Sequence, residues 1–572
     1  MTGFPIDALL QDLCEQFLPG RTILLQAPPG AGKTTRVPLA LLGELANCAP
    51  RAGRIWMIEP RRLAARAAAE RLAASLGEAV GQRVGFAVRG EQRRSARTQL
   101  EVITDGLFLR RLQADPSLEG VDCVLFDEFH ERRRDSDLAF TLLREAAPLL
   151  RPDLSVLVMS ATLDLTDLKK RLPEAVVLCS EGRAFPVKTF HQPPRRDERL
   201  PQQVLRALEA HALSLPRGSG VLVFLPGIAE INRCRELLER TSSLRSWQVN
   251  LLHGQLPLAQ QSAALKHCPD SCDGSVVLAS AIAESSVTID GVRLVIDSGL
   301  SRQLRFDPNT GMEGLETVPS SIASADQRRG RAGRQGPGQC IRLWSPAEQH
   351  RRPSFSPPEL QLADPQPVLM ELAQWGAGLG ETLPWLDPPP RAALQEGRGI
   401  LRELGIFTSN GTLTAVGRQL TGLGVHPRLG LLMLEAKRHG RAGLGCDLAA
   451  ILSERDPLPI SEVGCDLQLR LQAMEHSRRL GPLRERSRQL MQQLARIALE
   501  PSNASAGIDA AELVLRAFPQ WLALARPGKP GRFQLRQGRG ATLRDGDPLL
   551  SAEALAVARV DTGQRDTLIQ LA

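Results

Sequence analysis

A glycine-rich turn is the first stretch whose residue types could do chemistry. "QAPPGAGKTT" (26–35) follows the apolar run "TILLQA" and precedes a helical pattern, which is the setting of a phosphate-binding loop. In such a loop backbone N–H groups wrap phosphates, Lys33 reaches the outer phosphates and the Thr34 hydroxyl holds Mg²⁺. Ala27 stands where the usual pattern has its first glycine, so a glycine-rich turn without a ligand is the alternative. The expected ATP-binding residues of the loop are Ala27, Pro28, Pro29, Gly30, Ala31, Gly32, Lys33, Thr34 and Thr35.

Two adjacent carboxylates form the second candidate. Asp127 and Glu128 come directly after the apolar run of "VDCVLFDEFHERRRD". A phosphate-loop enzyme needs a second anchor for its metal at the end of a neighbouring strand, and Asp127 fits that role. Glu128 beside it fits the general base that orients and deprotonates the attacking water. The alternative is a pair that only solvates a strand end.

A basic segment near the middle of the chain is the third candidate. "DQRRGRAGR" (326–334) places Arg331 and Arg334 three residues apart, on one helical face, with Gln327 one turn before Arg331. Arginines on that face could stabilise the charge that develops on a γ-phosphate in the transition state. An ordinary solvated basic helix would show the same composition.

The elements that must position these residues follow an α/β pattern. Short apolar runs alternate with longer helical patterns, which predicts two tandem units with parallel sheets, joined near residues 181–190. An alanine-rich helix closed by Gly77 lies in the first unit. The expected strands are 22–27, 54–60, 100–104, 123–128 and 155–162 in the first unit, and 220–227, 249–254, 275–281 and 292–299 in the second.

From about residue 350 proline clusters punctuate helical stretches. A hairpin with its turn at Asn410 and Gly411, between helical patterns, has the composition of a small winged helix. Helical patterns continue to about residue 500, and strand-like segments follow. We expect no further terminal element after them, as in a fragment of a longer protein. The predicted domains are 1–185, 186–350, 351–430 (winged helix), 431–500 (helical bundle) and 501–572 (the start of a small OB-like β domain).

Composition sets wider limits on function. The 572 residues hold 71 Lys and Arg against 63 Asp and Glu, a net charge of +8, which suits a polyanionic partner without identifying one. The ten cysteines show no zinc or CxxC spacing, so we expect buried or inert thiols in a reducing compartment. No apolar run approaches the roughly 20 residues of a membrane span, which favours a cytoplasmic protein.

Eight motifs occur in the order seen in superfamily 2 helicases of the DEAH/RHA class. They are "GAGKTT", "PRRLAAR", "TDG", "DEFH", "SAT", "FLPG", "SAIAESSVTIDGV" and "QRRGRAGR". "EPRRLAAR" and "DEFHER" more narrowly resemble the bacterial HrpB type of ATP-dependent RNA helicase. The resemblance is dense over residues 20–345 and looser over 350–500. It implies two RecA-like domains that hold ATP and Mg²⁺ between them.

The resemblance also assigns expected roles to single residues. Thr34, Asp127 and Glu128 match the magnesium set, and Asp290 of "TIDG" matches a contact near the nucleotide. His130 matches the histidine that links the hydrolytic site to the second domain, and Ser160 and Thr162 match the motif that couples hydrolysis to strand movement. Expected phosphate-sensing residues are Gln327, Arg331 and Arg334, and expected contacts to the nucleic-acid backbone are Arg61, Arg62, Thr104, Asp105 and Gly106.

Some residues depart from the family pattern or fall outside it. Ala281 replaces an asparagine, Phe129 replaces an alanine, and Leu265 stands where relatives place an aromatic against the base, so we expect weak base discrimination. Residues 301–318 resemble the hairpin that relatives wedge at a duplex junction. "HERRRDSD" (130–137) is interpreted as a solvated turn, with a nucleic-acid contact as the alternative. Residues 526–544, with six Lys or Arg and no acid, are interpreted as a strand-binding surface or a solvated loop.

The motifs together predict an ATP-dependent nucleic-acid translocase, and the family resemblance implies that it is a 3′ to 5′ RNA helicase, which is the main hypothesis. Its partner would be single-stranded RNA, or a duplex with an overhang, held mainly through phosphates. Two alternatives stay open. An ATP-gated RNA clamp or scaffold would unwind little, which Ala281 favours, and a DNA-directed motor would use the same phosphate contacts.

Overall fold

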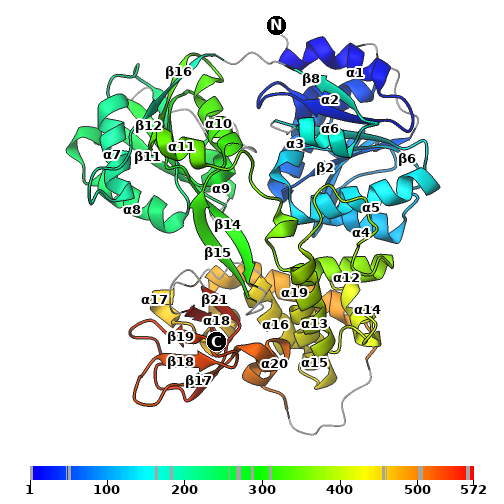
Figure 1. Ribbon diagram of the computed structural model, residues 1–572, viewed down its shortest axis with the longest axis vertical. Helices are drawn as coiled ribbons and strands as arrows, with labels where there is room; N and C mark the ends of the chain where they lie inside the picture. The colour runs from blue at the N-terminus through cyan, green and yellow to red at the C-terminus, as the bar shows by residue number, and fades with distance from the viewer. Residues whose placement is uncertain are drawn as a thin grey trace. The chain divides into compact units, whose positions relative to one another are not determined.

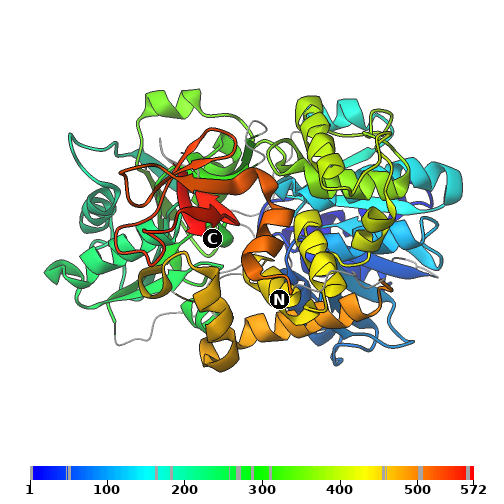
Figure 2. The same ribbon diagram turned by 90° about the horizontal axis from the view of Figure 1, so that it is seen from below.

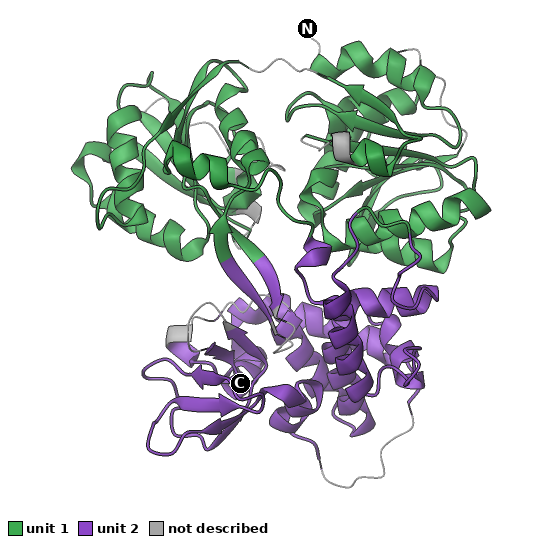
Figure 3. Cartoon of the chain, viewed as in Figure 1, with its two compact units in different colours: residues 1–303, 317–358, 384–386 green, residues 304–316, 359–383, 387–572 purple. Residues whose placement is uncertain are grey.

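The computed structural model divides into two compact units, which Figure 3 distinguishes by colour. Unit 1 comprises residues 1–303, 317–358 and 384–386, and unit 2 comprises 304–316, 359–383 and 387–572. This division does not test the five predicted domains, which stay a prediction. The structure describes residues 4–46, 48, 53–161, 165–180, 185–254, 256, 258–265, 272–284, 289–307, 312–453, 458, 460–499, 507–561 and 567–572.

An eight-stranded sheet forms the first part of unit 1 (Figure 1). Its order is β4-β3-β5-β2-β6-β7-β1-β8, and all neighbours are parallel except the β3–β4 pair. The strands are β1 (Thr22–Gln26), β2 (Arg54–Glu59), β3 (Val84–Val88), β4 (Glu91–Arg93), β5 (Leu100–Thr104), β6 (Val121–Phe126), β7 (Ser155–Ser160) and β8 (Val176–Cys179).

Helices cover both faces of this sheet because its central strands are apolar on both sides. Ile23 and Leu25 share a core with α1 to α3, whereas Phe126 packs edge-on against Phe108 and Phe140 of the opposite layer. Gly77, at φ +69°, follows α3 as predicted. The helices are α1 (Leu10–Gln16), α2 (Lys33–Leu41), α3 (Arg62–Ser75), α4 (Asp105–Ala114), α5 (Arg134–Leu150) and α6 (Leu165–Arg171), with 3-10 turns η1 (Pro5–Leu9) and η2 (Phe129–Glu131).

A six-stranded parallel sheet forms the second part of unit 1, in the order β11-β12-β10-β13-β16-β9. Its strands are β9 (Val187–His191), β10 (Ser219–Phe224), β11 (Trp247–Leu252), β12 (Gly274–Ala279), β13 (Val292–Asp297) and β16 (Gly338–Arg342). The helices are α7 (Leu200–His211), α8 (Ile228–Glu239), α9 (Leu258–Ala264), α10 (Ile322–Gly330) and α11 (Pro346–Arg351), with η3 (Ser242–Leu244), η4 (Ala281–Ala283) and η5 (Arg331–Gly333). The predicted pair of tandem parallel sheets is therefore confirmed.

The predicted hairpin over 301–318 is also present. Its strands are β14 (Leu300–Asp307) and β15 (Met312–Pro319), and an ion pair between Arg305 Nη1 and Glu316 Oε2 (3.2 Å) crosses it. Within unit 2 the backbone N–H of Phe306 donates to the carbonyl of Leu362. The hairpin is thereby fastened to the segment that leads into the helices of unit 2.

Unit 2 is mainly helical. The predicted hairpin at Asn410 and Gly411 is reduced to one antiparallel bridge between Phe407 and Leu413, with the turn at Ser409–Gly411 between them. The helices are α12 (Pro365–Trp375), α13 (Arg391–Glu403), α14 (Ala415–Thr421), α15 (Pro427–Arg438), α16 (Ala442–Ser453), α17 (Ile460–Val463), α18 (Leu467–His476), α19 (Gly481–Ala495) and α20 (Ala510–Ala517), with η6 (Glu359–Gln361), η7 (Arg478–Leu480) and η8 (Pro519–Trp521).

A six-stranded sheet, red in Figure 2, follows helix α20. Its order is β20-β17-β18-β19-β22-β21, and it shares one apolar core with the helices of unit 2. The expectation that no further element follows the basic segment is wrong, since three short strands lie beyond it. The strands are β17 (Leu522–Ala525), β18 (Arg532–Leu535), β19 (Gly540–Thr542), β20 (Ala554–Ala556), β21 (Arg559–Asp561) and β22 (Thr567–Leu571).

Two further expectations concern cysteines and membranes. Cys14 and Cys48, expected as free thiols, form a disulfide with their Cα atoms 5.7 Å apart. Spacing in the sequence could not reveal it because the two residues meet only when α1 packs beside α2.

Among the described helices, none combines the length and the apolar character needed to cross a bilayer.

Candidate nucleotide-hydrolysis site

The glycine-rich turn lies between β1 and α2, as the sequence predicts. Gly30 and Gly32 have φ angles of +83° and +98°, which only glycine adopts without strain. Lys33 is buried, and its Nζ donates to the carbonyls of Ala27 (2.6 Å) and Pro28 (3.4 Å). An ammonium group folded back onto the loop in this way is positioned to meet an anion that enters the loop.

Asp127 meets Thr34 across the sheet edge. Thr34 Oγ1 donates to Asp127 Oδ2 at 2.6 Å, although the residues lie far apart in sequence. Thr34 lies in α2, after β1, and Asp127 directly follows β6; β1 and β6 are separated only by β7, so their carboxyl ends share one edge. Burial and the neighbouring Glu128 charge raise the pKa of Asp127 to about 6, and Lys33 and Thr34 oppose that rise.

This pair of oxygen donors fits Mg²⁺. One carboxylate and one hydroxyl supply hard ligands, and Mg²⁺ commonly completes its shell with waters and substrate phosphates. No cluster of three or more His, Cys, Asp or Glu suited to a metal occurs in the described part of the chain. The donors present therefore suit a metal that arrives with a nucleotide better than a metal held by protein alone.

Glu128 has the environment expected of a base. It adopts φ +48°, and burial raises the pKa of its carboxyl, whereas the charges of Lys33, Arg331 and Arg334 lower it. Its Oε2 lies 3.5 Å from His130 Nδ1, and no hydrogen bond to this buried oxygen is found among the described residues. An acceptor left open in this way can take a proton from a bound water.

His130 and Ser160 lie beside the carboxylates. The backbone N–H of Ala161 donates to His130 Nδ1 (3.4 Å), and burial lowers the pKa of the imidazole to about 4. The ring is therefore neutral at pH 7, with its proton on Nε2. Ser160 ends β7 and is fully buried. Thr162 lies outside the described residues.

Glu59 is a carboxylate near the site that the sequence did not single out. It ends β2, next to β6, and is 2% exposed. Burial and then the charges of Asp127 and Glu128 raise its pKa well above the usual value. Both causes favour the neutral, protonated form of Glu59 over a third buried negative charge beside the site.

The arginine segment differs locally from the prediction. Helix α10 ends at Gly330, and Arg331 begins the 3-10 helix η5 with Arg334 as its C-cap, so the two arginines do not lie on the α-helix itself. Residues three apart still project from one face, because a 3-10 turn has three residues per turn. Burial lowers the pKa of Arg331 well below its usual value and that of Arg334 to about 10, and Glu128 opposes both shifts. Gln327 is buried one turn earlier, as expected.

Arg328 anchors this segment and was missed by the sequence. Its guanidinium donates to Asp297 Oδ1 (2.9 Å), Glu284 Oε2 (2.9 Å) and Ser301 Oγ (2.7 Å). Burial alone would lower its pKa, but the two carboxylates hold it above the usual value. Arg331 Nε also donates to the Glu284 carbonyl (3.0 Å). Glu284 therefore fixes Arg331 through its backbone while its side chain pairs with Arg328.

Replacing Arg328 by methionine is expected to lower the free energy of unfolding by about 3–5 kcal/mol, because Asp297 would stay buried without its partner. Urea unfolding monitored by circular dichroism measures the change. Arg329→Met is the matched control, since the Arg329 side chain is 44% exposed and its ion pair is with the half-exposed Asp326 at 3.6 Å. A loss as small as that of the control would contradict the anchoring role.

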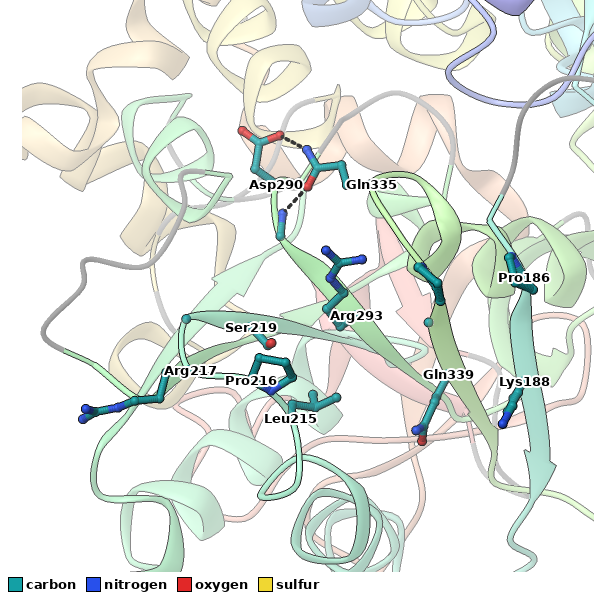
Figure 4. Close-up of a pocket in the computed structure, with 14 residues that line it drawn as sticks. Pro186, Lys188, Leu215, Pro216, Arg217, Ser219, Asp290, Arg293, Gln335 and Gln339 are labelled. Carbon is teal, nitrogen blue, oxygen red and sulfur yellow. Dashed lines mark hydrogen bonds between the residues drawn. The ribbon is translucent and has the colours of Figure 1, made fainter.

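Asp290 lies at the amino end of β13, on the rim of a cavity of about 910 Å³ (Figure 4). Gln335 Nε2 donates to Asp290 Oδ1 (3.0 Å), and Gln335 Oε1 accepts from the Gly291 N–H (2.7 Å). The cavity is also lined by Lys188, Arg217 and Arg293. The predicted contact of Asp290 with the nucleotide stays a prediction.

The predicted nucleic-acid contacts lie at the ends of β2 and β5. Arg62 is exposed, and Arg61 pairs with Glu131 (3.2 Å). Thr104 precedes α4, and Asp105, the first residue of that helix, accepts from the Gly106 N–H (2.8 Å). Burial and Asp135 raise the pKa of Asp105 to about 6.

The interpretation of residues 130–137 as a solvated turn is wrong. Arg132 pairs with Asp137 (3.0 Å), Arg133 with Asp105 (3.4 Å) and Arg134 with Asp135 (3.0 Å). The three arginines reach acids supplied by α4 and α5, and sequence composition does not indicate such partners. They tie the turn after Glu128 to the helices beside it.

Comparisons with known proteins agree with this geometry. The DEAD/DEAH box helicase family model matches residues 10–170, and the helicase conserved C-terminal domain model matches residues 203–336. ATP-dependent RNA helicase HrpB of Escherichia coli is 39% identical over 557 residues, covering 97% of this chain and 66% of that protein. ATP-dependent RNA helicase HrpA of E. coli is 32% identical over 463 residues, covering 80% of this chain and 35% of that protein.

Two solved structures of E. coli HrpB cover 100% of this chain. One, described as a DExH-box NTPase, has a TM-score of 0.86 at 38% identity, with 68% of its chain covered. The other, described as a DEAH/RHA helicase, has a TM-score of 0.88 at 37% identity, with 70% covered. The chain thus spans about two thirds of the length of HrpB.

Proposed function

Because this chain belongs to the DEAH/RHA helicase family, with the HrpB type as its near relatives, we propose that it hydrolyses ATP to move along single-stranded RNA. The observation that carries the proposal is the 2.6 Å hydrogen bond from Thr34 to Asp127, with Lys33 buried beside them. This arrangement provides both halves of a site for a nucleotide phosphate and its metal. We place the protein's activity in the cytoplasm.

In this proposal Lys33 and the loop residues 27–35 hold the phosphates of ATP, and Thr34, Asp127 and Glu128 hold Mg²⁺. The metal supplies positive charge to the phosphate oxygens. Glu128 takes the proton of the attacking water. Arg331 and Arg334 donate to the γ-phosphate oxygens, Gln327 orients them, and Asp290 contacts the nucleotide once the two sheets have closed on it.

In this proposal ATP hydrolysis is coupled to movement on RNA by residues that lie beside the nucleotide and by residues that contact the RNA. His130 and the segment containing Ser160 and Thr162 transmit the state of the nucleotide. Arg61, Arg62, Thr104, Asp105 and Gly106 contact the RNA backbone from the first sheet, mainly at phosphates, so we expect little sequence preference. Each cycle of closing and opening moves the strand by one step, in the 3′ to 5′ direction.

Strand displacement tests this function. RNA and DNA duplexes of one sequence, each with a 3′ or a 5′ overhang, are incubated with ATP and Mg²⁺. We expect displacement of the RNA duplex that carries the 3′ overhang. RNA-stimulated ATP hydrolysis without displacement would indicate a clamp instead, and preference for DNA overhangs would indicate a DNA motor.

A further inference from the structure

The N-terminal segment 4–16 packs directly on the glycine-rich turn. The backbone N–H of Ile6 donates to the carbonyl of Ala31 at 3.1 Å. A loop that binds phosphates must turn its N–H groups inward and its carbonyls outward, and an outward carbonyl that is buried needs a donor. Ala31 is 2% exposed, and Ile6 supplies that donor.

Asp7 joins this segment to helix α2. One carboxylate oxygen, Oδ2, accepts from the backbone N–H of Phe4 (2.9 Å) and so closes the turn η1. The other, Oδ1, accepts from Arg36 Nε (2.7 Å), one helical turn after the start of α2. The Arg36 guanidinium also lies 5.8 Å from the centre of the Phe4 ring. The Asp7 side chain therefore stabilises the turn η1 and also joins that turn to helix α2.

The fit between the segment and the loop is close. A Cβ atom on Gly32 would lie 3.0 Å from Phe4 Cβ, so Phe4 rests on the Gly32 backbone. Behind this contact Ile6, Leu10 and Leu13 are buried in the core that α2 shares, and the disulfide of Cys14 fixes α1 to Cys48, beyond α2. The buried core and the disulfide fix the segment on the side away from the loop. Asp7 and Ile6 can therefore hold the loop in place rather than move with it.

We propose that Asp7 is a positioning residue for ATP: through Arg36 and through the turn that presents the Ile6 N–H, it keeps the glycine-rich loop in its phosphate-binding shape. This inference rests on the proposed function, since the ligand of the loop is taken to be ATP. Asp7 touches no reacting atom. Its removal therefore affects how tightly the loop holds phosphates more than how fast a bound nucleotide is hydrolysed.

The test compares Asp7→Ala and Asp7→Asn with wild type in steady-state ATP hydrolysis at saturating RNA. We expect KM for ATP to rise about twofold to fivefold, the range set by a partly exposed ion pair, with kcat close to that of wild type. Asp12→Asn is the matched control, because it removes the same charge from an exposed position on α1. Arg36→Ala and the Asp7→Ala/Arg36→Ala double variant complete a cycle, in which the double variant should resemble the single ones.

The outcomes separate the inference from the proposed function. KM values that stay at the wild-type level in both Asp7 variants, or a fall in kcat alone, would overturn the positioning role. Additive effects of Asp7→Ala and Arg36→Ala would overturn the route through their ion pair. Asp7→Asn keeps the shape of the side chain, so it supplies the answer if Asp7→Ala fails to fold. A wild-type protein that neither binds nor hydrolyses ATP would overturn the proposed function, and this inference with it.

Discussion

Replacing Glu128 by glutamine is expected to lower ATP turnover by about 10²- to 10⁴-fold while leaving ATP binding nearly unchanged. The amide keeps the size of the side chain but cannot take a proton from water. Binding depends on other groups, because Lys33 and the Thr34–Asp127 pair remain in place. The affected quantity is therefore kcat, with the dissociation constant for ATP close to that of wild type.

Phosphate release at saturating RNA and titration with a fluorescent ATP analogue measure the two quantities separately. Glu119→Gln serves as the matched control, since Glu119 is exposed just before β6 and the same change is made there. Turnover close to wild type in the Glu128 variant would show that another group is the base. Loss of binding would show that Glu128 serves mainly to hold the nucleotide and its metal.

Sequence patterns predicted most of the central strands of the two parallel sheets, and they missed edge strands and also β3, which is buried along its whole length. The apolar runs that became β1, β2, β5 to β7 and β10 to β13 are recognisable alone. Edge strands such as β4 ("EQR") and β9 ("VKTFH") carry too few apolar residues for that. They are strands because an adjacent strand supplies their hydrogen bonds, which a local pattern does not contain.

The residues of the candidate site also divide into those that the sequence predicted and those that it missed. Lys33, Asp127 and Glu128 were predictable because their chemistry is local to strand ends, and the parallel topology then brings those ends together. Arg328 and Asp7 were not, because each acts through partners supplied by other segments, Asp297 and Glu284 for the first and Arg36 for the second. The arginines after Glu128 were misread for the same reason. A charged residue shows its role only when the residue that faces it is known.

Replacing Arg331 by alanine is expected to lower kcat for ATP hydrolysis by about 10²- to 10³-fold without weakening RNA binding. Arg331 is 4% exposed, and burial disfavours its charge, as the lowered pKa indicates. Burying a charged guanidinium costs free energy, and a protein retains such a group where an anion will face it. The γ-phosphate, on which negative charge develops during the reaction, is such an anion. The bond from Arg331 Nε to the Glu284 carbonyl fixes its direction in advance, so little reorganisation is needed during the reaction.

Arg329→Ala is the control that isolates this effect. It removes the same group two residues earlier, from a side chain that is 44% exposed and whose ion pair is with Asp326. Arg331→Lys should recover only part of the lost kcat. The lysine ammonium keeps the positive charge, but it lacks the planar guanidinium that can donate to the Glu284 carbonyl and to a phosphate at the same time. If Arg331→Ala hydrolysed ATP as fast as wild type at saturating RNA, the second sheet would contribute no transition-state charge through Arg331. Equal losses in both variants would instead point to a general electrostatic effect of the basic segment.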